Sequence, residues 1–147
     1  MKKPRMNRDR ATYREIEHTA DLGFEVSAPD LAALFASAGE ALYALIADSA
    51  TVENRRTIHV SLTGDNTEEL LHAWLCELLA LFNLQGFVGQ RCEIARLTDV
   101  QVEGQVYGAK LDLKRHAFHT EIKGVTYHDF KVWQEDGTWH ASVIFDV

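Results

Sequence analysis

Two segments of the chain carry apolar side chains at the three- and four-residue spacing of an α-helix, and they limit the folds that it can adopt. The first segment begins at Pro29 and Asp30 and its apolar stripe runs to Ile46. The second begins at Asn66, a favourable N-cap with Glu69 three residues later, and ends at Gly86. Each helix must bury one stripe against another element. The second is the more apolar, so we expect it to be the more buried.

Most of the remaining chain alternates between apolar and polar side chains with the two-residue period of β-strands. We expect two strands before the first helix, at 13–18 and 22–27, and one between the helices, at 57–62. After the second helix we expect strands at 92–97, 100–107, 107–113, 122–133 and 139–147. The Asp136-Gly137 pair predicts a tight hairpin turn between the last two.

This order of elements, ββαβα followed by several strands, predicts an α+β fold. Strands joined largely by hairpins and backed by helices form a two-layer sandwich, here a mainly antiparallel, multi-stranded sheet packed with two helices. The 147 residues are enough for one domain but not for two. We therefore expect a single domain over 13–147, preceded by a disordered basic tail at 1–12.

Charge is distributed unevenly along the chain. Residues 1–10 have a net charge of +4, whereas the remaining residues have a net charge of −11. An acidic body repels phosphate backbones, so we expect no stable direct binding of nucleic acid by the folded part.

The cysteines and the apolar runs indicate the cellular compartment of the protein. Two cysteines, Cys76 and Cys92, are too few for a disulfide framework and too far apart for a thiolate metal site. No apolar run approaches the length of a membrane span, and the N-terminus lacks the apolar core of a signal peptide. These features predict a cytoplasmic protein with reduced thiols and no membrane association.

Polar residues in unusual places are the candidates for chemistry, because phosphate-loop, zinc-protease and serine-hydrolase motifs are absent. The turn at 18–21 ends in Asp21, although spacing alone favours an ordinary turn in which the aspartate bonds its own backbone. Asp146 lies on an otherwise apolar last strand. Gly124 interrupts the alternation over 121–129 and indicates either a bulge or a close backbone approach, unless the strand is buried on both faces. His116 and His119 lack a third ligand at the usual spacing of a zinc site.

Four motifs in this order resemble the archease family: His-Thr-Ala-Asp at 18–21, Trp-Leu-x-Glu-Leu-Leu at 74–79, Ile-Lys-Gly-Val-Thr-Tyr-His at 122–128 and Val-Ile-Phe-Asp-Val at 143–147. The resemblance covers about 13–147 and implies an archease-like fold. It also implies a protein that is not itself an enzyme but activates an RtcB-type RNA ligase in tRNA splicing and RNA repair. Such a ligase joins a 2′,3′-cyclic phosphate or 3′-phosphate end to a 5′-hydroxyl, with GTP, a divalent metal and a guanylylated histidine. The activator is expected to promote guanylylation and multiple turnover, and to meet RNA only indirectly.

The resemblance further implies a metal site formed by Asp21, Asp146 and Val147, the last through its terminal oxygens. Oxygen ligands of this kind favour Ca²⁺, with Mg²⁺, Mn²⁺ or Zn²⁺ as alternatives. Contacts with the ligase or its nucleotide are expected from Lys123, and the neighbouring candidates are His18 and His128.

Two other functions stay open at this point. One is a stand-alone metal-dependent hydrolase in which His128 acts as a base. The other is an RNA-binding chaperone that uses the basic tail together with Lys114 and Arg115.

Overall fold

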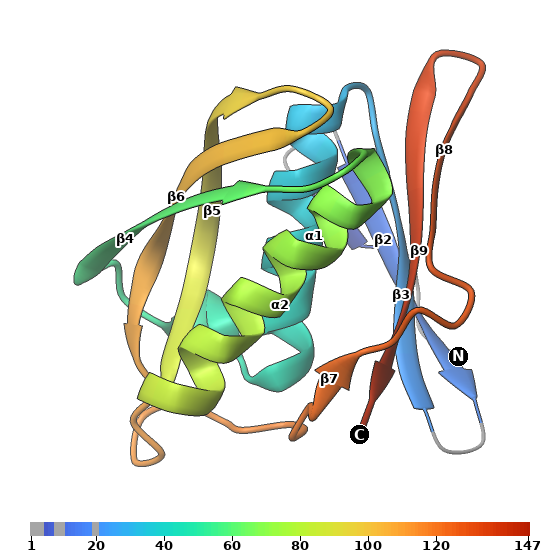
Figure 1. Ribbon diagram of the computed structural model, residues 1–147. Helices are drawn as coiled ribbons and strands as arrows, with labels where there is room; N and C mark the ends of the chain where they lie inside the picture. The colour runs from blue at the N-terminus through green and yellow to red at the C-terminus, as the bar shows by residue number, and fades with distance from the viewer. Residues whose placement is uncertain (1–4, 8–10, 19–20) are drawn as a thin grey trace.

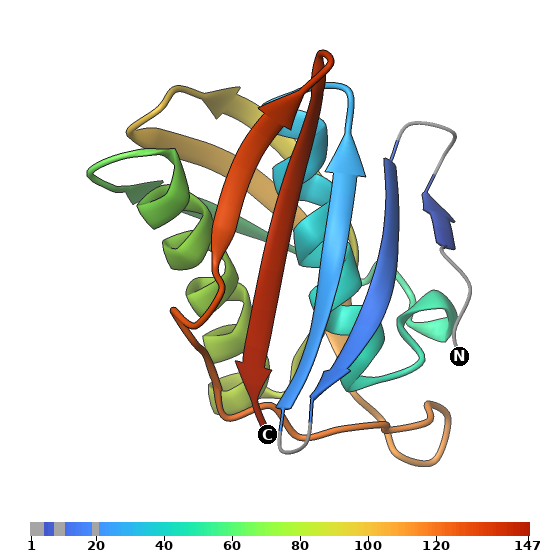
Figure 2. The ribbon, with the colours of Figure 1, turned by 90° about the vertical axis from the view of Figure 1, so that its right-hand side faces the viewer.

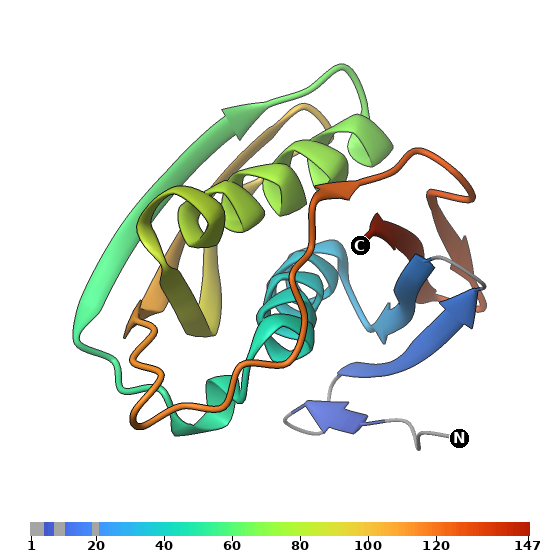
Figure 3. The ribbon, with the colours of Figure 1, turned by 90° about the horizontal axis from the view of Figure 1, so that it is seen from below.

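The expected α+β sandwich of antiparallel strands and two helices is confirmed by the structure, a computed structural model (Figure 1). It describes the backbone at 5–7, 11–18 and 21–147 and the side chains at 11–15 and 22–147. Within these residues the strands form two sheets instead of the single sheet expected, and the helices lie between them (Figures 1 and 3). One sheet has six strands in the order β1-β2-β3-β9-β7, with β8 also paired to β9, and the other has the order β4-β6-β5.

Both helices begin and end where the sequence predicts. Helix α1 is Leu31–Ile46, and its N-cap Asp30 accepts a hydrogen bond of 2.8 Å from the backbone N–H of Ala33. Helix α2 is Thr67–Gln85, and its N-cap Asn66 accepts one of 2.9 Å from Glu69. Gly86 ends α2 at a φ of 72°, a left-handed conformation that glycine adopts without strain.

The larger sheet is built from both ends of the sequence (Figure 2). Its outermost described strand, β1, is Arg5–Asn7, and β2 is Ala11–His18. The central strands are β3, Asp21–Ala28, and β9, Thr138–Asp146. On the far side of β9 are β7, Gly124–Val125, and β8, Lys131–Glu135. Apolar side chains of β3 and β9 are buried beneath the helices: Phe24, Val26, Val143 and Phe145.

The smaller sheet packs on the other side of the helices (Figure 3). It consists of β4, Arg56–Thr63, β5, Phe87–Leu97, and β6, Gln101–Lys110, all paired antiparallel. A short 3₁₀ helix, Ser49–Thr51, precedes β4. Neither described helix is long and apolar enough to cross a membrane.

The prediction that the second helix is the more buried is wrong. Ten of the 16 residues of α1 are buried, whereas only eight of the 19 residues of α2 are buried and its Leu84 is 83% exposed. The two helices contact each other at Trp74 of α2. Its side chain is fully buried, and its Nε1 donates a hydrogen bond of 2.9 Å to the carbonyl of Phe35 in α1.

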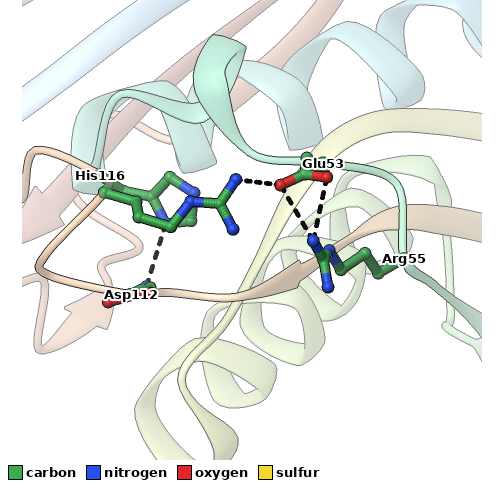
Figure 4. A network of polar contacts seen from close by, with 5 residues as sticks. Glu53, Arg55, Asp112 and His116 are labelled. Atoms are coloured by element: carbon green, nitrogen blue, oxygen red, sulfur yellow. Dashed lines mark hydrogen bonds and ion pairs between the residues drawn. The ribbon is translucent and has the colours of Figure 1, made fainter.

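Two predicted strands are also wrong. The strand expected at 107–113 does not form, because β6 continues to Lys110 and the chain then turns. The N–H of Leu111 donates to the carbonyl of Gly86, and Arg115 bonds to Glu53 on another loop (Figure 4). Of the strand expected at 122–133 only β7 and the start of β8 form, because Asp129 has a φ of 53° and breaks the extended backbone between them.

The segment expected to be a disordered tail is described in part. Strand β1 pairs with the first residues of β2, which begins at Ala11. The other residues up to position 10 lie outside the described residues, so disorder there stays a prediction.

Candidate functional site

Three strands from distant parts of the sequence meet at Asp146. The backbone pairing places Asp146 opposite Asp21 on one side and opposite Gly124 on the other. The backbone N–H of Lys123 donates a hydrogen bond of 2.7 Å to the carbonyl of Asp146. Figure 2 shows the end of β9 beside the start of β3. Residues opposite each other in antiparallel strands have Cα atoms about 4.5–5.5 Å apart, so the two aspartates are close neighbours.

The site residues chosen from the sequence differ in what is described of them. The side chains of Asp21 and His18 lie outside the described residues, although their backbones pair with each other in β2 and β3. The side chains of Asp146 and Lys123 are exposed, and Val147 is 37% exposed. Among the described cationic side chains, none forms an ion pair with Asp146.

His72 on α2 holds the edge of this site, although it belongs to no recognised sequence motif. Its side chain is buried, and its Nε2 lies 2.9 Å from the carbonyl oxygen of Val125 in β7. A carbonyl only accepts, so Nε2 carries the proton and Nδ1 faces the Sγ of Cys76 at 3.5 Å as an acceptor. The imidazole also stacks on Tyr127, with ring centroids 3.9 Å apart. A histidine in the apolar stripe of a predicted helix is the one signal that could have pointed to this contact.

A half-buried thiol lies beside this histidine. Burial raises the pKa of the Cys76 thiol, which favours the protonated donor that the Nδ1 of His72 needs. The same burial makes Cys76 a poor nucleophile.

His128 follows β7 and is open to solvent. Its side chain is 70% exposed, and Nε2 lies 3.3 Å from the Oδ2 of Asp129. Its backbone N–H donates to the Oγ1 of Thr126, which in turn donates to the carbonyl of Ile144 in β9. The segment after β7 is therefore fixed to β9 while the His128 imidazole points into water.

The interpretation of Gly124 as a bulge or a close approach is wrong. Its pairing with β9 is regular, and a Cβ added there would meet nothing within 4 Å. The close approach is at Gly23 instead, where an added Cβ would lie 2.3 Å from the carbonyl oxygen of Val143.

Of the expected metal ligands, the structure describes the side chains of Asp146 and Val147. Among the described side chains, which exclude that of Asp21, no group of three or more His, Cys, Asp or Glu gathers to hold an ion. His116 is buried and its Nδ1 accepts a hydrogen bond of 3.0 Å from the backbone N–H of Asp112 (Figure 4), whereas His119 is exposed. The donors at the Asp146 end are carboxylate and carbonyl oxygens, which suit a hard cation such as Ca²⁺ or Mg²⁺.

Comparison with known proteins gives consistent matches over nearly the whole chain. The model of the archease protein family matches residues 13–147. The protein archease of Methanopyrus kandleri is 38% identical over 138 residues, which cover 92% of this chain and 99% of that protein. The protein archease of Pyrococcus abyssi is 32% identical over 139 residues, with 92% and 98% covered.

Two solved structures share the fold. The solution structure of protein 1598 of Methanobacterium thermoautotrophicum has a TM-score of 0.79 and 28% identity, and the match covers 92% of this chain and 98% of that one. The crystal structure of an archease from Thermotoga maritima, described as a possible chaperone, has a TM-score of 0.66 and covers 91% and 96%. Its identity is 22%, so this second likeness shows the fold alone.

Proposed function

The chain belongs to the archease family, and from this membership and the pairing of Asp21 with Asp146 we propose that it is a metal-binding protein cofactor of an RtcB-type RNA ligase. It promotes guanylylation of the ligase and multiple turnover, and so serves tRNA splicing and RNA repair in the cytoplasm. It catalyses no reaction itself and meets RNA through the ligase.

The observation that carries the proposal is the backbone register between β3 and β9, which sets two acidic residues opposite each other at one end of the sheet. Two carboxylates on directly opposed residues repel each other unless a cation lies between them. Asp21 and Asp146 would hold a divalent ion together with the main-chain oxygens of Val147. The ion is Ca²⁺ in our proposal, with Mg²⁺, Mn²⁺ and Zn²⁺ as the competitors to test. When bound, it supplies positive charge that attracts phosphate oxygens.

Lys123 provides a second cationic group at the same end. Its side chain is exposed and its backbone N–H donates to the carbonyl of Asp146, so its backbone is fixed at the end of the sheet where the ion would bind. We assign it, with His18 and His128, to contact with the ligase or its nucleotide. The ion and Lys123 together would offset the carboxylates at this end of a chain with a net charge of −7, which fits a protein that approaches a nucleotide site without binding RNA broadly.

Ligation assays with a purified RtcB-type ligase test the role. The ligase is assayed at single and multiple turnover, with and without this protein, and calcium binding is measured by calorimetry. Asp146→Asn should abolish both stimulation and binding. Glu135→Gln, which neutralises an exposed carboxylate elsewhere on the same sheet, is the control and should leave both unchanged.

Two outcomes would contradict different parts of the proposal, the activator role and the role of the metal. Equal ligation yields with and without the protein would remove the activator role. Folded Asp21→Asn and Asp146→Asn variants that stimulate normally would remove the metal from the mechanism but leave the activator role.

The described residues offer no observation in favour of the two other functions. Among the described side chains, the exposed His128 imidazole contacts Asp129 and no nucleophile that it could activate. Arg115 donates a hydrogen bond to Glu53, so part of the charge expected to bind RNA is already paired (Figure 4).

A further inference from the structure

Strand β4 forms an open edge of the smaller sheet. It is the end strand of the order β4-β6-β5, and no second described strand pairs with it (Figure 3). Its eight residues pair with β6 without a register shift, and the strand contains neither proline nor lysine. A long, regular and nearly uncharged edge strand is a ready template for pairing with another chain.

The opposite edge of the same sheet is protected. Strand β5 has register shifts at Gly89/Arg91 and at Ile94/Arg96, and such bulges interrupt edge pairing. In addition, the backbone N–H of Cys92 donates a hydrogen bond of 2.9 Å to the Oε2 of Glu40 on α1.

The edge of the larger sheet beside α2 is protected too. The backbone N–H of Val132 in β8 donates a hydrogen bond of 3.1 Å to the Oε2 of Glu68, and His72 binds the carbonyl of Val125 in β7. On the other side of that sheet, β1 pairs only with the first three residues of β2, and three of the five β2 residues beyond it are charged, which disfavours edge pairing. Strand β4 is therefore the long described edge without such protection.

The pairing pattern shows which groups of β4 are free. The N–H of Gly64 donates to the carbonyl of Val100, so the hydrogen-bonded positions toward β6 recur at every second residue before it. The alternate residues direct their N–H and C=O groups away from β6, and their side chains are exposed: Thr57, His59, Ser61 and Thr63. Among the described residues, none makes a hydrogen bond to these backbone groups.

We propose that β4 pairs antiparallel with β4 of a second copy of the chain, about a two-fold axis at Val60. In this register Thr57 lies opposite Thr63 and His59 lies opposite Ser61, so every free N–H and C=O of these residues finds a partner. Any other antiparallel register leaves at least one of them unpaired within the strand. The two small sheets then become one continuous sheet with both α2 helices on the same face.

The side chains favour a second copy as the occupant. Arg56 would lie opposite Gly64, so no two like charges face each other directly in this register. The inward row is also self-complementary, because the half-buried Ile58 would lie opposite the half-buried Leu62. A symmetric contact of this kind closes on itself as a dimer. A single strand edge is a small interface, so we expect a Kd on the order of 100 μM.

Sedimentation equilibrium on the full chain, from about 10 μM to about 1 mM, tests the dimer. The variant His59→Lys/Ser61→Lys sets like charges directly opposite across the axis and should raise the Kd at least about tenfold. The matched variant His59→Lys/Ser61→Glu sets opposite charges there and should restore or lower it. Both positions are on the exposed face, so circular dichroism and thermal unfolding should show intact folds.

Amide hydrogen exchange locates the contact. The N–H groups of Ile58, Val60 and Leu62 should be protected at every concentration, whereas those of His59 and Ser61 should gain protection only as the concentration rises. A chain that stays monomeric at 1 mM, on the order of ten times the expected Kd, would overturn the proposal. A dimer that ignores both charge variants and leaves these amides unprotected would overturn it as well, because another surface would be in use. Neither result bears on the ligation assay.

Discussion

His72 offers the sharpest test of how the fold supports the Asp146 end. The variant His72→Leu keeps an apolar group of similar size in the buried position but removes the donor to Val125. An unpaired buried carbonyl costs about 1–3 kcal/mol, and the lost stack on Tyr127, with centroids 3.9 Å apart, costs about 0.5–1.5 kcal/mol. Leucine recovers part of this through its greater apolarity, so we expect a net loss of about 1.5–3 kcal/mol in the free energy of unfolding.

Urea and thermal unfolding measure this loss. A domain of this size loses about 2–4 °C of Tm per kcal/mol, so the Tm should fall by about 3–12 °C. His119→Leu, which changes an exposed histidine, is the control and should shift stability by less than about 0.5 kcal/mol. His72→Gln can still donate to Val125 and should recover part of the loss.

Local exchange separates this contact from general destabilisation. The N–H groups of Lys123 and Thr126 donate to β9 on either side of β7, so they should exchange at least about tenfold faster in His72→Leu. An unfolding midpoint equal to that of the wild type, together with unchanged exchange at these amides, would refute the reasoning.

Two further predictions concern positions away from His72. Gly23→Ala should destabilise the protein by about 3 kcal/mol or more, because the added Cβ would lie 2.3 Å from a backbone oxygen of β9. The control Gly124→Ala has open space around its Cβ and should change stability by less than about 0.5 kcal/mol. Equal urea midpoints for the two variants would contradict this account of the packing. Hydrogen bonds from Arg115 and then Arg55 lower the pKa of Glu53, so this carboxylate stabilises the fold fully above its unfolded pKa and loses that effect as the pH falls through its folded pKa. Glu53→Gln should therefore be less stable than the wild type at pH 7, with the difference shrinking below about pH 4, and an equal difference at pH 7 and pH 3 in urea titrations would be evidence against it.

Local sequence signals predict the elements that depend on local physics. Asp30, Asn66 and Gly86 mark helix ends because each satisfies backbone groups in its own turn. The division of the strands between two sheets is not visible in this way, because alternation shows which face is buried but not which strand is the neighbour. Local signals also do not predict the loop at 111–123, since its course depends on distant groups such as Glu53 and the carbonyl of Gly86.

In the candidate site, too, some residues can be predicted from local sequence and others depend on distant contacts. Asp146 is conspicuous because a carboxylate interrupts an apolar strand, and the backbone pairing then brings Asp21 opposite it. His72 is hidden because a single histidine in an apolar helical stripe is ordinary for a core position. Its significance appears only when β7, more than 50 residues later, presents a carbonyl to it. The metal role of the aspartates stays a prediction until binding is measured.

The position of β9 has a consequence for how the protein is made. This strand lies between β3 and the β7 and β8 strands, yet it follows all of them in the sequence. During synthesis on the ribosome, β3 has no partner on that side until β9 has left the exit tunnel. A chain truncated before residue 138 would keep both helices and the smaller sheet but would expose the inner edge of β3. Such a product should be recognised by chaperones and proteases, so cells would accumulate the protein only when its reading frame has been translated through β9.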